Sequence, residues 1–394
     1  MVDPAGLAML VVAATASLFM AWTIGAGSSG STPFAPAVGA NAISVMRAGF
    51  VVGVLGLLGA IVQGENVSQA MGRELVAGAS LSPVAAAVAL LTAASLVAVG
   101  VFTGYPIATA FTATGAVVGT GLALGGAPAW AKYQEIASLW VAVPFAGGGA
   151  AYATARLLRS DLADRVAVAP LGFLVGAIVA NVEFAFLSTG GGSVAVAAAR
   201  ATGTGTVGRV AATAVLGAAV AAAVYADVAR APERGQRHFL LALGGLVAFS
   251  AGGSQVGLAV GPLLPLLEDV PVTYVLAGGG VGLLVGSWTG APRMIKTLSR
   301  DYSSLGPRRS IAALIPSFAI AQTAVFLGVP VSFNEIIVSA IVGSGVAASR
   351  GGGPKAVSGR KMAFTALAWV ASLAVALLAG YGAYTALVAL GVAG

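Results

Sequence analysis

The chain reads GYPIAT at residues 104–109 and GVPVSFN at residues 328–334, and each segment interrupts a long apolar run. An ungapped alignment of 104–121 with 328–345 matches several glycines and one proline, so that Pro106 falls on Pro330. A helix broken by glycine and proline leaves backbone groups unpaired, which is tolerated at membrane depth only inside the protein. Interrupted apolar segments at corresponding places in two halves are typical of transporters, whose substrate site lies between them.

Further segments repeat in the same order at an offset of about 224 residues. They pair AGSSGS at 26–31 with AGGSQ at 251–255, residues 55–64 with 281–290, and WVA at 140–142 with WVA at 369–371. We therefore expect two related membrane repeats with a break in each. The predicted units are 1–157 (first repeat), 158–238 (a connecting helix pair with its loops) and 239–394 (second repeat). The count of crossings leaves the relative orientation of the repeats open, and we expect them to be inverted.

The composition indicates a membrane protein, because 58% of the residues are hydrophobic and only 8% are charged, whereas soluble chains carry about 25% charged residues. A span needs about 17–25 apolar residues. Stretches long enough to cross lie at roughly 5–25, 43–64, 83–103, 136–157, 166–188, 207–228, 239–250, 272–290, 310–328 and 361–390. Shorter runs at 106–124, 255–267 and 331–348 are predicted to be half-helices or re-entrant hairpins. The expected fold is an all-α polytopic membrane protein with about 10–12 transmembrane segments.

The net charge of +7 does not indicate a nucleic-acid partner, because the basic residues lie in short loops between the apolar runs. They are read as topology signals, although Arg200 and Arg209 leave one loop in conflict with the positive-inside rule. The first apolar run lacks a basic flank and is expected to be a span, not a cleaved signal. An excess of arginine, alanine and glycine suggests a GC-rich genome. We expect a multi-pass protein of a prokaryotic plasma membrane.

Neutral hydrogen-bonding side chains gather at the predicted breaks. A helix that begins beside such a break presents unpaired N–H groups and the positive end of its dipole, which attract an anion. Close packing of small residues is the alternative reading of each single position. The candidate substrate-binding residues are Ser28, Ser29, Ser31, Thr109, Thr112, Ser254, Gln255, Ser332 and Asn334.

Ionisable groups inside apolar runs are functional candidates by default. Glu183, in the connecting run 166–188, and Glu335, just inside the second hairpin, are the candidate coupling residues, with a structural carboxylate as the alternative for each. No metal site and no catalytic residue is predicted. The chain has no cysteine and one histidine, His238, and it shows neither a Ser/His arrangement nor metal-ligand spacing. An enzyme is therefore not expected.

The segments around these residues resemble the inorganic phosphate transporter (PiT) family of sodium- or proton-coupled phosphate permeases, over nearly the whole chain. WTIGAGS at 22–28 and GGSQVGLAVGP at 252–262 are similar to the two family signatures, and residues 104–111 and 328–335 are similar to its repeated Gly-x-Pro motif. The chain departs from the family where the signatures place two aspartates thought to serve cation coupling. Ser28 and Gln255 stand at those positions.

The resemblance implies a permease that moves inorganic phosphate by alternating access. Sulfate or another oxyanion is the alternative substrate, and a non-transporting sensor or partner subunit of the same fold is the alternative role. The expected partners are phosphate or a related oxyanion and membrane lipid, with a homodimer as an open question and no nucleic acid. No resident cofactor is expected, and the coupling ion is a proton or sodium.

Overall fold

The computed structural model describes residues 4–184, 187, 192–301, 305–349 and 359–392. Within that part the chain is almost entirely helical, and ten helices are long and apolar enough to cross a membrane. The two short strand pairs join β1 (Val76–Ala77) to β2 (Ala127–Pro128) and β3 (Glu183–Phe184) to β4 (Gly192–Ser193). The expected all-α polytopic fold is confirmed.

The helices follow one another in the order that the sequence repeat predicts. The first part of the chain forms α1 (Pro4–Gly27), α2 (Ala35–Gly39), α3 (Val45–Gln63), α4 (Glu65–Gln69), the π-helical turn η1 (Ala70–Glu74), α5 (Pro83–Thr103), α6 (Thr109–Ala123) and α7 (Trp130–Leu157). The middle forms α8 (Asp164–Asn181), α9 (Val194–Thr202) and α10 (Gly205–Arg230). The last part forms α11 (Pro232–Val260), the 3₁₀ helix η2 (Gly261–Leu266), α12 (Val272–Thr289), α13 (Ala291–Asp301), α14 (Pro307–Leu327), α15 (Phe333–Ser349) and α16 (Gly359–Ala389).

The predicted break at residues 251–255 is wrong, because α11 runs through it without interruption to Val260. The glycines of this stretch serve packing instead. A side chain at Gly252 would collide with the backbone of Gly56, so glycine lets α11 lie directly against α3. The regular helix ends further on, at η2, where Pro262 and Pro265 remove backbone donors. The separate runs 239–250 and 255–267 therefore belong to one long helix and its 3₁₀ end.

Helices from the two ends of the chain pack against one another in matching pairs. Helix α1 packs against α12, and its counterpart in the second repeat, α11, packs against α3. In the same way, α7 packs against α15, and its counterpart α16 packs against α6. Close approach in the first pair also depends on a glycine, since a side chain at Gly25 would meet the carbonyl group of Leu283. Each half therefore completes its core with helices of the other half.

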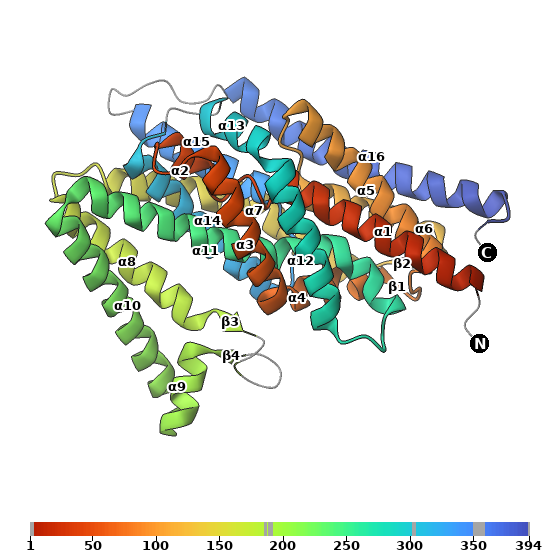
Figure 1. Ribbon diagram of the computed structural model, residues 1–394, viewed down its shortest axis with the longest axis horizontal. Coiled ribbons are helices and arrows are strands. Elements are labelled where there is room, and N and C mark those ends of the chain that lie inside the picture. The colour runs from red at the N-terminus through yellow and green to blue at the C-terminus, as the bar shows by residue number, and fades with distance from the viewer. Residues whose placement is uncertain (1–3, 185–186, 188–191, 302–304, 350–358, 393–394) are drawn as a thin grey trace.

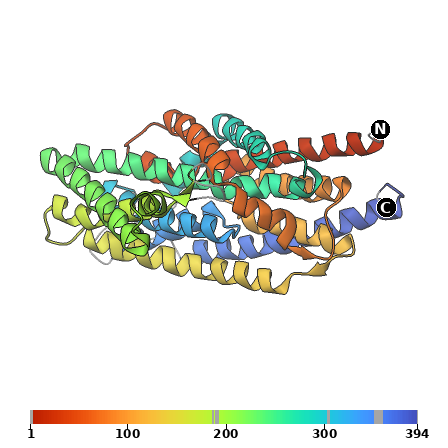
Figure 2. The ribbon, with the colours of Figure 1, turned by 90° about the horizontal axis from the view of Figure 1, so that it is seen from below.

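Corresponding helices run in opposite directions. Figures 1 and 2 both show α1 running toward the centre of the molecule from the end where the termini lie, whereas α11 enters from the opposite end. Helices α7 and α16 also run in opposite directions, since α7 starts at the end where the termini lie and α16 runs toward that end (Figures 1 and 2). This arrangement is what an inverted repeat requires. The connecting helices α8 and α10 pack side by side and extend with α9 away from the other helices (Figure 1).

Candidate functional site

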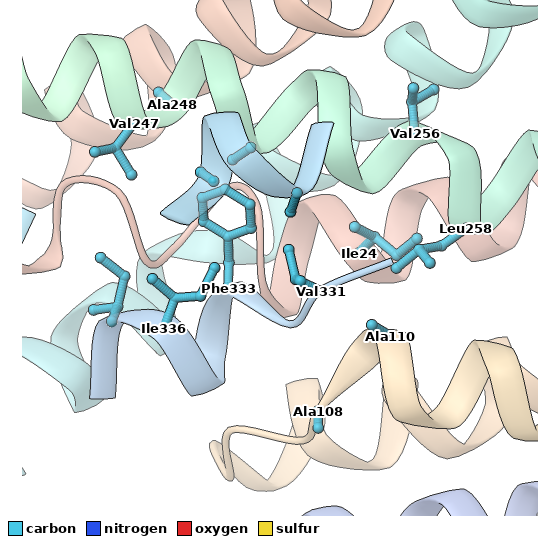
Figure 3. Packing of buried hydrophobic residues seen from close by; sticks show 14 of the residues in the cluster. Ile24, Ala108, Ala110, Val247, Ala248, Val256, Leu258, Val331, Phe333 and Ile336 are labelled. Atoms are coloured by element: carbon cyan, nitrogen blue, oxygen red, sulfur yellow. The ribbon is translucent and has the colours of Figure 1, made fainter. Parts of the chain in front are cut away.

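The candidate site lies where two helices begin and two others pass or end. Helices α5 and α14 both end at a glycine in the left-handed region, Gly104 with φ 77° and Gly328 with φ 63°. Only glycine adopts this conformation without strain. An extended turn with a proline follows each glycine, and α6 and α15 then begin at Thr109 and Phe333. Figure 3 shows the starts of α6 and α15 beside α1 and α11, with their apolar side chains packed around the junction.

Gln255 of α11 is the centre of the polar contacts. Its Oε1 accepts hydrogen bonds from Thr109 Oγ1 at 2.9 Å and from Ser28 Oγ at 3.3 Å. Its Nε2 donates to the carbonyl oxygen of Val331 at 2.6 Å. Thr109 Oγ1 also lies 3.3 Å from Ser28 Oγ. One fully buried amide side chain thus joins the end of α1, the start of α6 and the turn before α15.

Asn334, in the first turn of α15, makes the second set of connections. Its Nδ2 donates to the carbonyl oxygen of Ile107 at 2.7 Å and to that of Gly27 at 3.1 Å. The chain at the end of α1 and the chain around the start of α6 are therefore each bonded by a side chain of α11 and by a side chain of α15. Four side chains form these contacts, and Ser254 and Ser332 lie next to contact residues in the sequence. We call these six fully buried residues the polar cluster: Ser28, Thr109, Ser254, Gln255, Ser332 and Asn334.

Several polar atoms of this cluster have no partner among the residues that the structure describes. Ser254 Oγ, Ser332 Oγ and Asn334 Oδ1 are buried without a hydrogen bond, as is Oε2 of the neighbouring Glu335. A buried polar group left unpaired costs about 1–3 kcal/mol. Buried polar atoms are otherwise almost always paired, and an exception calls for an explanation such as a ligand, an ion or water. Donors and acceptors are thus available here for a ligand.

Three of the predicted binding residues use their hydroxyl groups locally. Ser29 Oγ donates to the carbonyl oxygen of Ile24 at 3.5 Å, and Ser31 Oγ to that of Ser28 at 3.1 Å. Thr112 Oγ1 donates to the carbonyl oxygen of Ala108 at 3.0 Å, within its own helix. These side chains stabilise the turn after α1 and the first turn of α6, and they are not among the unpartnered groups.

The two predicted coupling carboxylates lie in different places. Glu335 is 2% exposed in the first turn of α15, beside the polar cluster. The sequence predicted Glu183 inside the helical run 166–188, and this is wrong. Helix α8 ends at Asn181, and Glu183 is an exposed residue of β3. It lines a cavity of about 790 Å³ with Gln63 and Gln322. None of the six residues of the polar cluster lines this cavity.

Two tryptophans that sequence reasoning did not assign to the site hold its turns in place. Trp140 Nε1 of α7 donates to the carbonyl oxygen of Pro330 at 2.7 Å, and Trp369 Nε1 of α16 donates to that of Pro106 at 2.9 Å. Each repeat thus secures the turn of the other repeat. The signal was present in the sequence, because Trp140 and Trp369 occupy matching positions in the repeat.

The polar cluster contains no charged residue, and Glu335 is the carboxyl group next to it. Among the described residues, no group of three or more His, Cys, Asp or Glu side chains is placed to hold a metal ion. The arrangement offers neutral donors, backbone N–H groups at two helix starts, and one adjacent carboxyl group. Chemically, it suits a small anion better than a bare cation.

Comparison with known proteins places the chain in a family. The family model described as the phosphate transporter family matches residues 24–380. The chain is 26% identical to "Inorganic phosphate transporter 2-1, chloroplastic" of Arabidopsis thaliana, over 84% of this chain and 64% of that longer protein. It is 26% identical to "Putative phosphate permease PH0640" of Pyrococcus horikoshii, over 92% of this chain and 93% of the relative.

The fold is also that of a solved protein, "The sodium-dependent phosphate transporter", with a TM-score of 0.77 at 21% identity, over 97% of this chain and 100% of the other. With ten apolar helices long enough to span a bilayer, the chain is a multi-pass membrane protein. The family model covers well over half of its length. The chain therefore belongs to the phosphate transporter family.

Proposed function

We propose that this protein is an inorganic phosphate permease that binds its substrate at the polar cluster. The observation that carries the proposal is the set of buried, unpartnered polar atoms on Ser332 and Asn334, at the start of α15, and on Ser254 of α11, next to Gln255 in the sequence. Membership in the phosphate transporter family and relatives named as phosphate permeases support the same substrate. The family model and the similar solved protein are described as transporters, which favours a transport role over an enzymatic one.

The helix starts supply the positive potential that the side chains lack. Neither Ala108, which precedes α6, nor a side chain of the preceding turn caps the first N–H groups of that helix. Unpaired N–H groups at a helix N-terminus carry about half a positive charge. The start of α6 lies beside the buried polar cluster, so an anion there gains stabilisation without a fixed arginine or lysine. Neutral donors also allow release, which transport requires.

The acceptors in the site favour phosphate over sulfate. Phosphate at neutral pH carries at least one proton and gains from a hydrogen-bond acceptor, whereas sulfate carries none. Asn334 Oδ1 and Glu335 Oε2 are both buried without a hydrogen bond. An unpaired acceptor left facing a fully ionised anion would cost free energy. We therefore prefer phosphate, with sulfate as the competing substrate in the test.

We propose a proton as the coupling ion. Ser28 and Gln255 bond to each other as neutral groups, and neither supplies the full negative charge with which a sodium site is usually compensated. The one carboxyl group beside the cluster belongs to Glu335, and a buried carboxyl group can carry a proton. The sodium dependence in the name of the similar solved protein is a property of that protein.

We further propose that residues 1–157 and 239–394 are two inverted repeats joined by the unit 158–238, and that the protein works by alternating access. Support comes from the opposed directions of α1 and α11 (Figure 1) and from the matching pairs α1 with α12 and α11 with α3. Glycine-lined helix contacts of this kind lack long side chains that interlock. They permit sliding or rocking without a large steric barrier.

Uptake by the purified protein in proteoliposomes tests the function. Labelled phosphate and labelled sulfate are supplied separately, with sodium and proton gradients imposed one at a time. We expect phosphate uptake that follows an inward proton gradient and does not respond to sodium, and sulfate uptake about tenfold slower. Uptake of neither anion by folded, inserted protein would instead favour the non-transporting sensor or partner subunit.

A further inference from the structure

A second polar cavity, of about 910 Å³, lies away from the polar cluster, and we call it the basic cavity. It is formed where α7 has just ended, where α8, α11 and α14 begin, and beside the segment that follows α2. Arg237 in this wall and Gln255 in the cluster are both on α11, 18 residues apart, which corresponds to about 27 Å along the helix. The basic cavity is therefore separate from the proposed transport site.

Five arginines from three parts of the chain line this cavity. They are Arg159, Arg234, Arg237, Arg308 and Arg309, against two acidic residues, Asp164 and Glu233. Positive charge is thus concentrated here beyond what the two carboxylates can neutralise.

The acid–base contacts leave guanidinium groups available. Asp164 is occupied, since its Oδ1 binds Arg308 in an ion pair of 2.6 Å and its Oδ2 accepts from Gln236 Nε2 at 2.9 Å. Arg237 Nε donates to the carbonyl oxygen of Ala42 at 2.9 Å. Within the part of the chain that the structure describes, no ion pair involves the exposed Arg159 or Arg234.

Two helix starts open toward the same space. Helix α11 begins at Pro232 and α14 at Pro307, and neither has a side-chain cap on its first N–H groups. Their dipoles add positive potential to that of the arginines. Arginine and helix N-termini are the groups that proteins combine to bind phosphate oxygens. The feature therefore rests on a cavity, a guanidinium cluster and two open helix starts together.

We propose that the basic cavity binds a phosphate-bearing anion, with Arg159 and Arg234 as its principal ligands. Inorganic phosphate and the phosphate headgroup of an anionic lipid share this chemistry, and both can reach a basic cavity at the helix ends of a membrane protein. Binding here does not depend on transport, so a protein that proves inert in uptake would still bind the anion.

The test uses the full-length protein and a double variant, Arg159→Gln with Arg234→Gln. The control is Arg156→Gln with Arg230→Gln, which removes the same charge from exposed positions nearby that do not line the cavity. Both are made in the Gln255→Leu background, so that the polar cluster does not contribute. One arm measures equilibrium binding of labelled inorganic phosphate in detergent. The other measures, by native mass spectrometry, retention of phosphatidic acid against phosphatidylcholine.

We expect the Arg159/Arg234 variant to weaken binding of at least one probe about tenfold or more, and the control variant to change neither. Weakened binding of inorganic phosphate alone identifies a soluble anion as the ligand, and loss of phosphatidic acid alone identifies a lipid headgroup. The proposal would be overturned if the two variants bound both probes equally well, or if neither variant bound either probe.

Discussion

Replacing Gln255 with leucine is expected to lower phosphate uptake about a hundredfold. Leucine has nearly the same size as glutamine but cannot bond to Ser28, Thr109 or the carbonyl oxygen of Val331, which Gln255 joins. Each buried group left unpaired costs about 1–3 kcal/mol, and 1.4 kcal/mol corresponds to a factor of about ten. Of the three bonds lost, two that each cost about 1.4 kcal/mol already account for the expected change.

The measurement is the initial rate of labelled phosphate uptake into proteoliposomes, normalised to inserted protein. Gln134→Leu is the control, because Gln134 is an exposed residue of α7 that is not part of the polar cluster. An unchanged rate in Gln255→Leu would show that the joined segments do not form the transport site. A low rate in both variants would point to a general loss of folded protein.

The second large effect is expected for Glu335→Gln. Glutamine preserves the shape of the side chain but cannot bind and release a proton, so proton-driven accumulation of phosphate should fall at least about tenfold. Exchange of internal for external phosphate requires no net proton movement and should remain. The two assays together separate a coupling role from a role in binding.

Glu183→Gln is the matched control for this prediction. Both glutamates are candidates from sequence, but Glu183 is an exposed residue of β3, while Glu335 is buried beside the cluster. Accumulation should therefore persist in Glu183→Gln. If Glu335→Gln still accumulates phosphate against a gradient, or if it loses exchange as well, Glu335 does not carry the coupling proton.

The sequence predicts most of the helices because lipid imposes a simple rule of length and apolarity. Helix α5 has the predicted bounds, and α6 and α15 begin after a Gly-x-Pro segment, as the repeat indicates. The error at residues 251–255 has a clear cause. Glycine and serine in a membrane helix indicate either a break or a close helix contact, and only the position of α3 shows that Gly252 serves a contact.

The polar cluster could be predicted only in part. Thr109, Gln255 and Asn334 lie on three different helices, and Ser28 lies in the turn after α1. The repeat pattern alone indicated that these segments meet. The pattern did not separate Ser332, whose Oγ has no partner among the described residues, from Thr112, whose Oγ1 bonds within its own helix. That distinction depends on side-chain direction at a helix start, which the spacing of residues does not determine. Likewise, Glu183 could not be placed until the end of α8 was known.

The central claim is that the unpartnered hydroxyl groups of Ser254 and Ser332 bind phosphate, and the double variant Ser254→Ala with Ser332→Ala tests it most directly. Neither Oγ has a partner in the described part of the chain, so their removal should leave thermal stability unchanged or raise it, since an unsatisfied buried group is eliminated. We predict that equilibrium binding of labelled phosphate weakens about tenfold or more in the same protein. Unchanged phosphate affinity in a variant of equal or greater stability would contradict the account.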